Sequence, residues 1–204
     1  AETTDSEGDT SGVNTATLDL GGNVRFGDDG PGDPTVEVAA DTLVGLTFDG
    51  GLTDGNFTGD DSTDDTDAST TVAVVDFSDA FTIGNEDDYG ADGAGETTVS
   101  YKLQLAVVEG TASGLTSGGA TVRLYINDAG TLVTGSTAAT EGAIGTANTV
   151  FTLALDPATG VLTQTQLAVI DHADADTYDG AYIADVASLA DDLVELVASA
   201  ETTD

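Results

Sequence analysis

The sequence predicts an all-β chain, an antiparallel β-sandwich with long acidic loops and at most one short helix. Apolar residues alternate with polar ones in several short stretches, and turn sequences separate those stretches. The 204 residues include 29 Asp but only 9 Glu, together with 26 Gly and 33 Thr. Because Asp and Gly favour turns, Thr favours strands and Glu favours helices, this composition indicates strands joined by acidic loops.

The clearest predicted strand covers residues 99–107. Every second residue in it is apolar, which is the pattern of a half-buried strand. The apolar positions are Val99, Tyr101, Leu103, Leu105 and Val107.

Two hairpins are predicted in the second half of the chain. In the first, residues 122–126 are followed by the turn NDAG and then by Leu132 and Val133. In the second, residues 151–155 lead into DPATG, and residues 161–170 return as a strand. Pro and Gly suit the first corner and the positive φ of such a turn.

Further strands are expected at 15–20, 23–26, 35–38, 43–48, 71–77 and 193–199, and one helical turn or two around 185–192. Many short strands with polar turns favour a sandwich. The alternative is an elongated β-solenoid, but the sequence contains no short GGxGxD repeat.

The charge excludes several classes of partner. The formal net charge is -35, and only Arg25, Lys102 and Arg123 are basic. A nucleic acid needs cationic side chains to displace its counterions, so none is expected as a partner. No apolar run exceeds four residues, so we expect no direct insertion into a membrane. Without cysteine there is neither a disulfide nor a thiolate metal site.

One internal repeat bears on the organisation of the chain. The pentapeptide AETTD occupies residues 1–5 and again residues 200–204. This predicts a unit of a tandem array, although chance similarity between two Thr-rich and Asp-rich segments is the alternative. We expect residues 1–34 to form an N-terminal strand pair and an inter-repeat calcium-binding segment, and residues 35–204 to form a ligand-binding β-sandwich.

Acidic residues gather in three clusters suited to calcium, which takes six to eight oxygen ligands in irregular geometry. The alternative for each cluster is a solvated acidic loop. The first cluster is Asp5, Glu7 and Asp9, completed by Asp28 and Asp29; the second is Glu86, Asp87, Asp88 and Asp92; the third is Asp171, Asp174, Asp176 and Asp179.

Five residues are candidate ligand contacts. Lys102 and Arg123 lie on the polar sides of predicted strands, where each either receives a ligand carboxylate or forms a local ion pair. Tyr89, Tyr178 and Tyr182 flank the second and third acidic clusters, where they either contact a peptide or pack at the rim.

No enzymatic activity is expected. His172 is the only histidine, and no GxSxG, HExxH or phosphate-binding loop accompanies it. A structural hydrogen bond at the end of a strand is the preferred role for this side chain.

Four blocks in order carry a resemblance to a known family. They are residues 3–31, 89–105 (YGADGAGETTVSYKLQL), 148–179 and 189–204 (LADDLVELVASAETTD). Together they resemble the repeats of giant RTX adhesins secreted by type I systems. The resemblance implies an extracellular, calcium-dependent β-sandwich on a bacterial cell surface, acting in cell adhesion, cohesion or biofilm formation.

Three classes of function follow. The first is a calcium-dependent module that binds a protein or peptide, for which a free C-terminus is one candidate ligand, beside neighbouring repeats of the same adhesin. The second is a structural extender stiffened by calcium, with no ligand of its own. The third is a domain of a halophile whose acidity is an adaptation to salt. The excess of Asp over Glu favours the first two, and the long segments 49–67 and 138–149 favour binding.

Overall fold

The computed structural model describes residues 7, 32–39, 43–47, 71–85, 87, 95–172 and 187–203. Within these ranges the chain forms antiparallel strands and two 3-10 turns, and it contains no α-helix, which confirms the predicted all-β class. None of the described helical turns is long and apolar enough to cross a membrane. The elements are β1 Thr35–Val38, β2 Val72–Asp76, η1 Ser78–Ala80, β3 Phe81–Gly84, β4 Glu96–Leu105, β5 Ala112–Ser117, β6 Ala120–Ile126, β7 Leu132–Ser136, η2 Glu141–Ala143, β8 Thr149–Leu155, β9 Val161–Gln166 and β10 Val194–Thr203.

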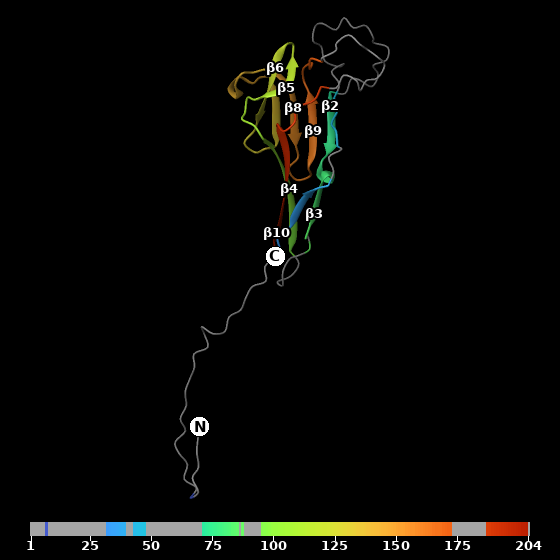
Figure 1. Ribbon diagram of the computed structural model, residues 1–204, viewed down its shortest axis with the longest axis vertical. Helices are drawn as coiled ribbons and strands as arrows, with labels where there is room; N and C mark the ends of the chain where they lie inside the picture. The colour runs from blue at the N-terminus through green and yellow to red at the C-terminus, as the bar shows by residue number, and fades with distance from the viewer. Residues whose placement is uncertain are drawn as a thin grey trace, which may run out of the picture.

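The larger layer is a six-stranded sheet in the order β2-β9-β8-β7-β6-β5 (Figure 1). Strands β5 to β9 follow one another as an antiparallel meander, and β2 is added beside β9. Both predicted hairpins are confirmed, since Ile126 is opposite Val133 and Leu155 is opposite Leu162. The returning strand of the second hairpin, predicted over 161–170, ends at Gln166.

The second layer is centred on the long pair of β4 and β10, which are antiparallel over ten residue pairs. The predicted alternation in β4 is confirmed, because Tyr101 and Leu103 are buried while Lys102 and Gln104 are exposed. These apolar side chains belong to one core with residues of the large sheet, among them Val122, Leu124, Val133, Val150 and Leu153. Burying each such side chain contributes about 1.5 to 3 kcal/mol.

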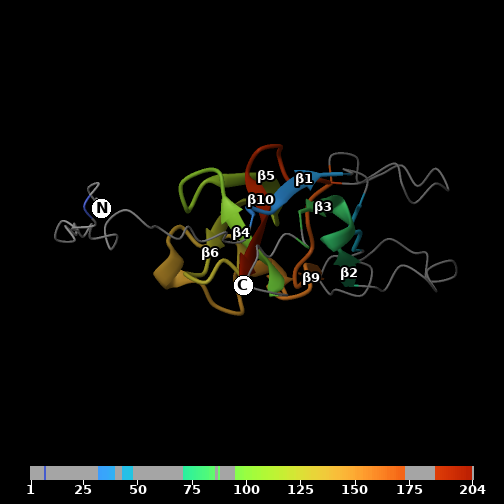
Figure 2. The ribbon, with the colours of Figure 1, turned by 90° about the horizontal axis from the view of Figure 1, so that it is seen from below.

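A small antiparallel pair, β1 with β3, lies beside the lower half of β4 and β10 (Figures 1 and 2). The Phe81 ring of β3 packs on the Tyr101 ring of β4, with centroids 6.0 Å apart. The lower halves of β4 and β10 extend past the end of the large sheet (Figure 1). The fold therefore has a two-layer body and a narrower end made of two strand pairs.

The segment 43–47 is not the predicted strand, because it has no ladder partner among the described residues. It nevertheless keeps the alternation of a strand, with Val44 and Leu46 exposed. A Cβ on Gly45 would lie 2.9 Å from Oε1 of Gln164, and the Gln164 amide donates to the Thr47 hydroxyl at 3.0 Å. Contacts with side chains on one face of β2 and β9 hold this segment instead of a strand edge.

The helical turn expected at 185–192 is also wrong over its described part, residues 187–192. Ala190 donates its N–H to the Ser113 carbonyl of β5 at 2.9 Å, and Asp192 has a positive φ of 58°. Leu193, which follows, is buried in the core. Tertiary contacts override the helical preference of this stretch.

Three further predicted strands are confirmed: 35–38 as β1, 71–77 as β2 and 193–199 as β10. Strands β3 and β5 were not predicted. The sequence of β5, ASGLTS, lacks a long apolar alternation, and its Gly114 has a φ of 89°. The strands predicted at 15–20 and 23–26 lie outside the described residues.

Candidate functional site

The outer side of β2 has no partner strand among the described residues, and we call it the β2 edge. The hydrogen bonds from Gln166 N to Thr71 O (2.7 Å) and from Phe77 N to Gly160 O (3.1 Å) both belong to the β2–β9 ladder. In an antiparallel ladder every second residue directs its N–H and C=O groups to the partner strand. The N–H and C=O groups of Val72, Val74 and Asp76 therefore point away from β9. Within the described part of the chain these outward groups have no backbone partner.

Two of the three outward residues of the β2 edge, Val72 and Val74, have apolar and exposed side chains, and the third, Asp76, is exposed and acidic. Val72 is 41% and Val74 is 64% exposed. A row of neutral side chains leads from the edge across the sheet, because Val72 is opposite Thr165, Thr165 opposite Thr152, and Thr152 opposite Thr134. In a chain with a net charge of -35, this row is an uncharged surface.

The opposite edge of the sheet, at β5, is closed. Ala190 N donates to Ser113 O at 2.9 Å, and Asp171 N donates to Thr116 O at 2.8 Å. The Ser117 hydroxyl donates to Val169 O at 2.6 Å. These segments occupy two of the β5 carbonyls, those of Ser113 and Thr116, and lie where another strand would pair, so the two edges of the sheet differ in what they can bind.

The Asp171 carboxylate closes the β5–β6 turn at this end. Its Oδ1 accepts the N–H of Gly118 at 2.9 Å, and its Oδ2 accepts the N–H of Gly119 at 2.8 Å. Both glycines have positive φ, as a tight hairpin turn requires. The Gly119 N–H lowers the pKa of Asp171 most, followed by the Thr116 hydroxyl, and the nearby His172 adds to the effect.

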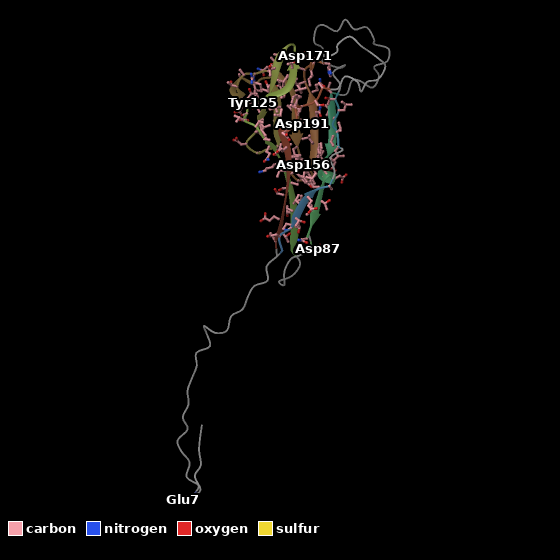
Figure 3. The ribbon with its side chains drawn as sticks, viewed as in Figure 1. Glu7, Asp87, Tyr125, Asp156, Asp171 and Asp191 are labelled. Atoms are coloured by element: carbon pink, nitrogen blue, oxygen red, sulfur yellow. The ribbon has the colours of Figure 1, made fainter. Side chains whose placement is uncertain are left out.

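Of the predicted metal ligands, only Glu7, Asp87 and Asp171 are among the described residues. Asp171 lies at the upper end of the six-stranded sheet, and Asp87 lies at the lower, narrower end (Figure 3). In the described ranges no three His, Asp or Glu side chains gather closely enough to hold a metal ion. The other predicted ligands lie outside the described residues: Asp5, Asp9, Asp28, Asp29, Glu86, Asp88, Asp92, Asp174, Asp176 and Asp179.

The two basic candidate contacts differ in their surroundings. Lys102 is exposed on β4. Arg123 is half-buried on β6, and its guanidinium donates to the Gly110 carbonyl at 2.7 Å, which ties the β4–β5 loop to the sheet. The nearby Tyr125 is buried and donates to Ala138 O at 2.8 Å. Tyr89, Tyr178 and Tyr182 lie outside the described residues.

The sequence predicted the strand that forms the β2 edge but did not single out Val72 and Val74. Both lie in the run VAVV, residues 72–75, where all four side chains are apolar. The sequence of this run therefore does not show which face of the strand is exposed. No local signal identifies an edge strand, because its position depends on pairing between residues distant in sequence.

The described residues define an antiparallel β-sandwich domain in which the β2 edge of the large sheet has no partner strand and the β5 edge is covered. The chain belongs to the family described as Domain of unknown function (DUF5801), whose model matches residues 56–204. No curated protein matches it, and no solved structure does.

Proposed function

We propose that this chain is a calcium-dependent peptide- or protein-binding module of a bacterial cell-surface adhesin, acting outside the cell in adhesion, cohesion or biofilm formation. The observation that carries the proposal is the contrast, within the described part of the chain, between the open β2 edge and the covered β5 edge. A protein with no strand-binding role usually blocks both edges of its sheet.

The ligand would add to the sheet as an extended strand. The outward backbone groups of Val72 and Val74 would pair with the main chain of the peptide, and alternate peptide side chains would lie over the neutral face. With 38 acidic side chains in the chain, a basic or neutral peptide is favoured at this edge. A free terminal carboxylate would need a cation beside it.

Calcium would supply that cation. Carboxylate oxygens are its preferred ligands, and the third acidic cluster offers Asp171 together with Asp174, Asp176 and Asp179. The Asp171 carboxylate has about four lone-pair sites, of which two accept the N–H groups of Gly118 and Gly119 and one the Thr116 hydroxyl, so one remains for a metal ion. A bound ion would also reduce the repulsion among neighbouring carboxylates.

The test removes one outward N–H from the β2 edge in the full chain. Val74→Pro deletes a donor that faces away from β9, so the β2–β9 ladder stays intact. The matched control is Val38→Pro in β1, because Val38 is also exposed (72%) and its N–H points away from β3. The probe is a labelled library of nonapeptides with free carboxyl ends, applied with calcium and with chelator.

We expect the unaltered chain and Val38→Pro to retain peptides in calcium and to release them in chelator, and Val74→Pro to retain none. If no peptide is retained while calcium still raises the melting temperature, the chain is a calcium-stiffened extender. If retention persists in Val74→Pro, the ligand binds elsewhere.

A further inference from the structure

The first four residues of the second AETTD segment, Ala200 to Thr203, have a defined place in the fold. Ala200, Glu201, Thr202 and Thr203 form the last part of β10, opposite Val99, Thr98, Thr97 and Glu96 of β4. They lie at the narrow lower end of the domain, where β10 and β4 run beyond the large sheet (Figure 1).

Side chains as well as backbone groups hold this segment. The hydroxyls of Thr97 and Thr202 are hydrogen-bonded to each other at 2.8 Å. Ala200 and Thr202 are half-buried, whereas Glu201 and Thr203 are exposed. Cross-strand pairs of this kind are the unit of stability in a two-stranded ladder.

Residues 1–4 carry the same four side chains in the same order, Ala-Glu-Thr-Thr. If residues 1–4 lay opposite residues 96–99 in the same register, they would form the same backbone ladder. The Thr3 hydroxyl would then be hydrogen-bonded to the Thr97 hydroxyl, as the Thr202 hydroxyl is. The contacts of this ladder do not depend on which copy of the segment supplies them.

We propose that residues 96–99 of β4 are a docking site for the N-terminal Ala-Glu-Thr-Thr of a second copy of this chain, which takes the place of Ala200–Thr203 and joins the copies head to tail. This inference does not rest on the peptide-binding role of the β2 edge. In a tandem chain with one AETTD at each junction, the same segment would end β10 of one copy and begin the next copy.

In separate molecules the attached tail has the advantage, because it is tethered to its site and its effective concentration is high. Docking by a second copy therefore becomes visible when the attached tail is weakened and the N-terminal segment is left intact. Glu201 is the position to change. The hydrogen bond from Ala106 N to Leu193 O belongs to the same ladder. Because every second residue pair of an antiparallel ladder is hydrogen-bonded, Glu201 and Thr98 form such a pair.

The experiment compares four full-length chains by sedimentation velocity over a range of concentrations: the unaltered chain, Glu201→Pro, Glu2→Pro and the double variant. Proline at 201 removes a ladder donor from the attached tail. Proline at 2 makes the matched change in the N-terminal segment. We expect concentration-dependent dimers and longer oligomers of Glu201→Pro, and monomers of the other three.

A second measurement uses a labelled peptide, AETTDSEG, which should bind Glu201→Pro saturably and the unaltered chain much more weakly. The proposal is overturned if Glu201→Pro neither associates nor binds the peptide, or if the double variant associates as strongly as Glu201→Pro. Should Glu201→Pro lose the circular dichroism of the folded chain, Thr203→Pro with the control Thr4→Pro makes the same comparison at the last pair of the ladder.

Discussion

The N–H of Leu103 donates a 2.6 Å hydrogen bond to the carbonyl of Gly130, which joins β4 directly to the turn between β6 and β7. Two residues earlier, the Tyr101 N–H donates to the Pro157 carbonyl in the turn between β8 and β9 at 2.8 Å. The second layer is therefore attached to the first by hydrogen bonds to two hairpin turns as well as by the apolar core. Substitutions in those turns should affect the whole sandwich.

Gly130→Ala should be strongly destabilising. Gly130 has a φ of 66°, and a Cβ there would lie 2.7 Å from the Leu103 carbonyl oxygen. The matched control is Gly118→Ala, since Gly118 has a φ of 57° but nothing within 4 Å of its Cβ position. We expect the control to cost about 1 kcal/mol for its left-handed backbone and Gly130→Ala to cost about 2 kcal/mol more, measured by urea denaturation. An equal loss of unfolding free energy in both variants would show that the turn can accommodate a Cβ at position 130 without displacing β4.

Gly135→Ala tests the packing between β7 and β8. Gly135 is opposite Phe151, and a Cβ at Gly135 would overlap the Phe151 ring. Because Phe151 is buried in the core, its ring has little room to move. We expect a loss of about 2 to 4 kcal/mol in the free energy of unfolding. Gly142→Ala, with nothing within 4 Å of its Cβ position, should change stability little. A similar effect of both substitutions would contradict this account.

Asp171→Asn should lower stability in a pH-dependent way. The single oxygen of an asparagine amide can accept from only one of the Gly118 and Gly119 N–H groups. The free energy of unfolding should therefore fall by about 1 kcal/mol at neutral pH. This value is low because Asp171 is exposed to solvent. The pKa of Asp171 is below its ordinary value of 3.8 in the folded chain, so the stabilisation is present above that value and is lost as the pH falls through the folded pKa.

The measurement for Asp171 is the free energy of unfolding from pH 7 down to pH 3, for the unaltered chain and for Asp171→Asn. We expect the difference between the two to shrink at the acid end of this range. Asp191→Asn, a change at another exposed aspartate (Figure 3), is the control. A difference that does not change with pH would show that the carboxylate charge contributes nothing to the turn.

The sequence predicted most of the fold because much of it is local. The alternation through Tyr101 and Leu103 identified β4, and the turns NDAG and DPATG identified two hairpins. It could not identify β5, whose Gly114 packs against Ala190, or the irregular path of 43–47, which depends on the distant Gln164. The β2 edge was equally inaccessible, since the exposure of Val74 follows from strand order. Composition alone indicated calcium ligands, and of these the structure describes only Glu7, Asp87 and Asp171.

Calcium should raise the melting temperature of the chain. The 38 acidic side chains repel one another, and an ion that binds the folded state alone stabilises it by about 2.7 kcal/mol at a concentration one hundred times its Kd. Sodium chloride at matched ionic strength is the control, because it screens charge without occupying a site. We expect millimolar calcium to raise the melting temperature by several degrees over this control, and chelator to reverse the change. If chelator has no effect and only molar salt stabilises the chain, its acidity is an adaptation to salt and the calcium proposal fails.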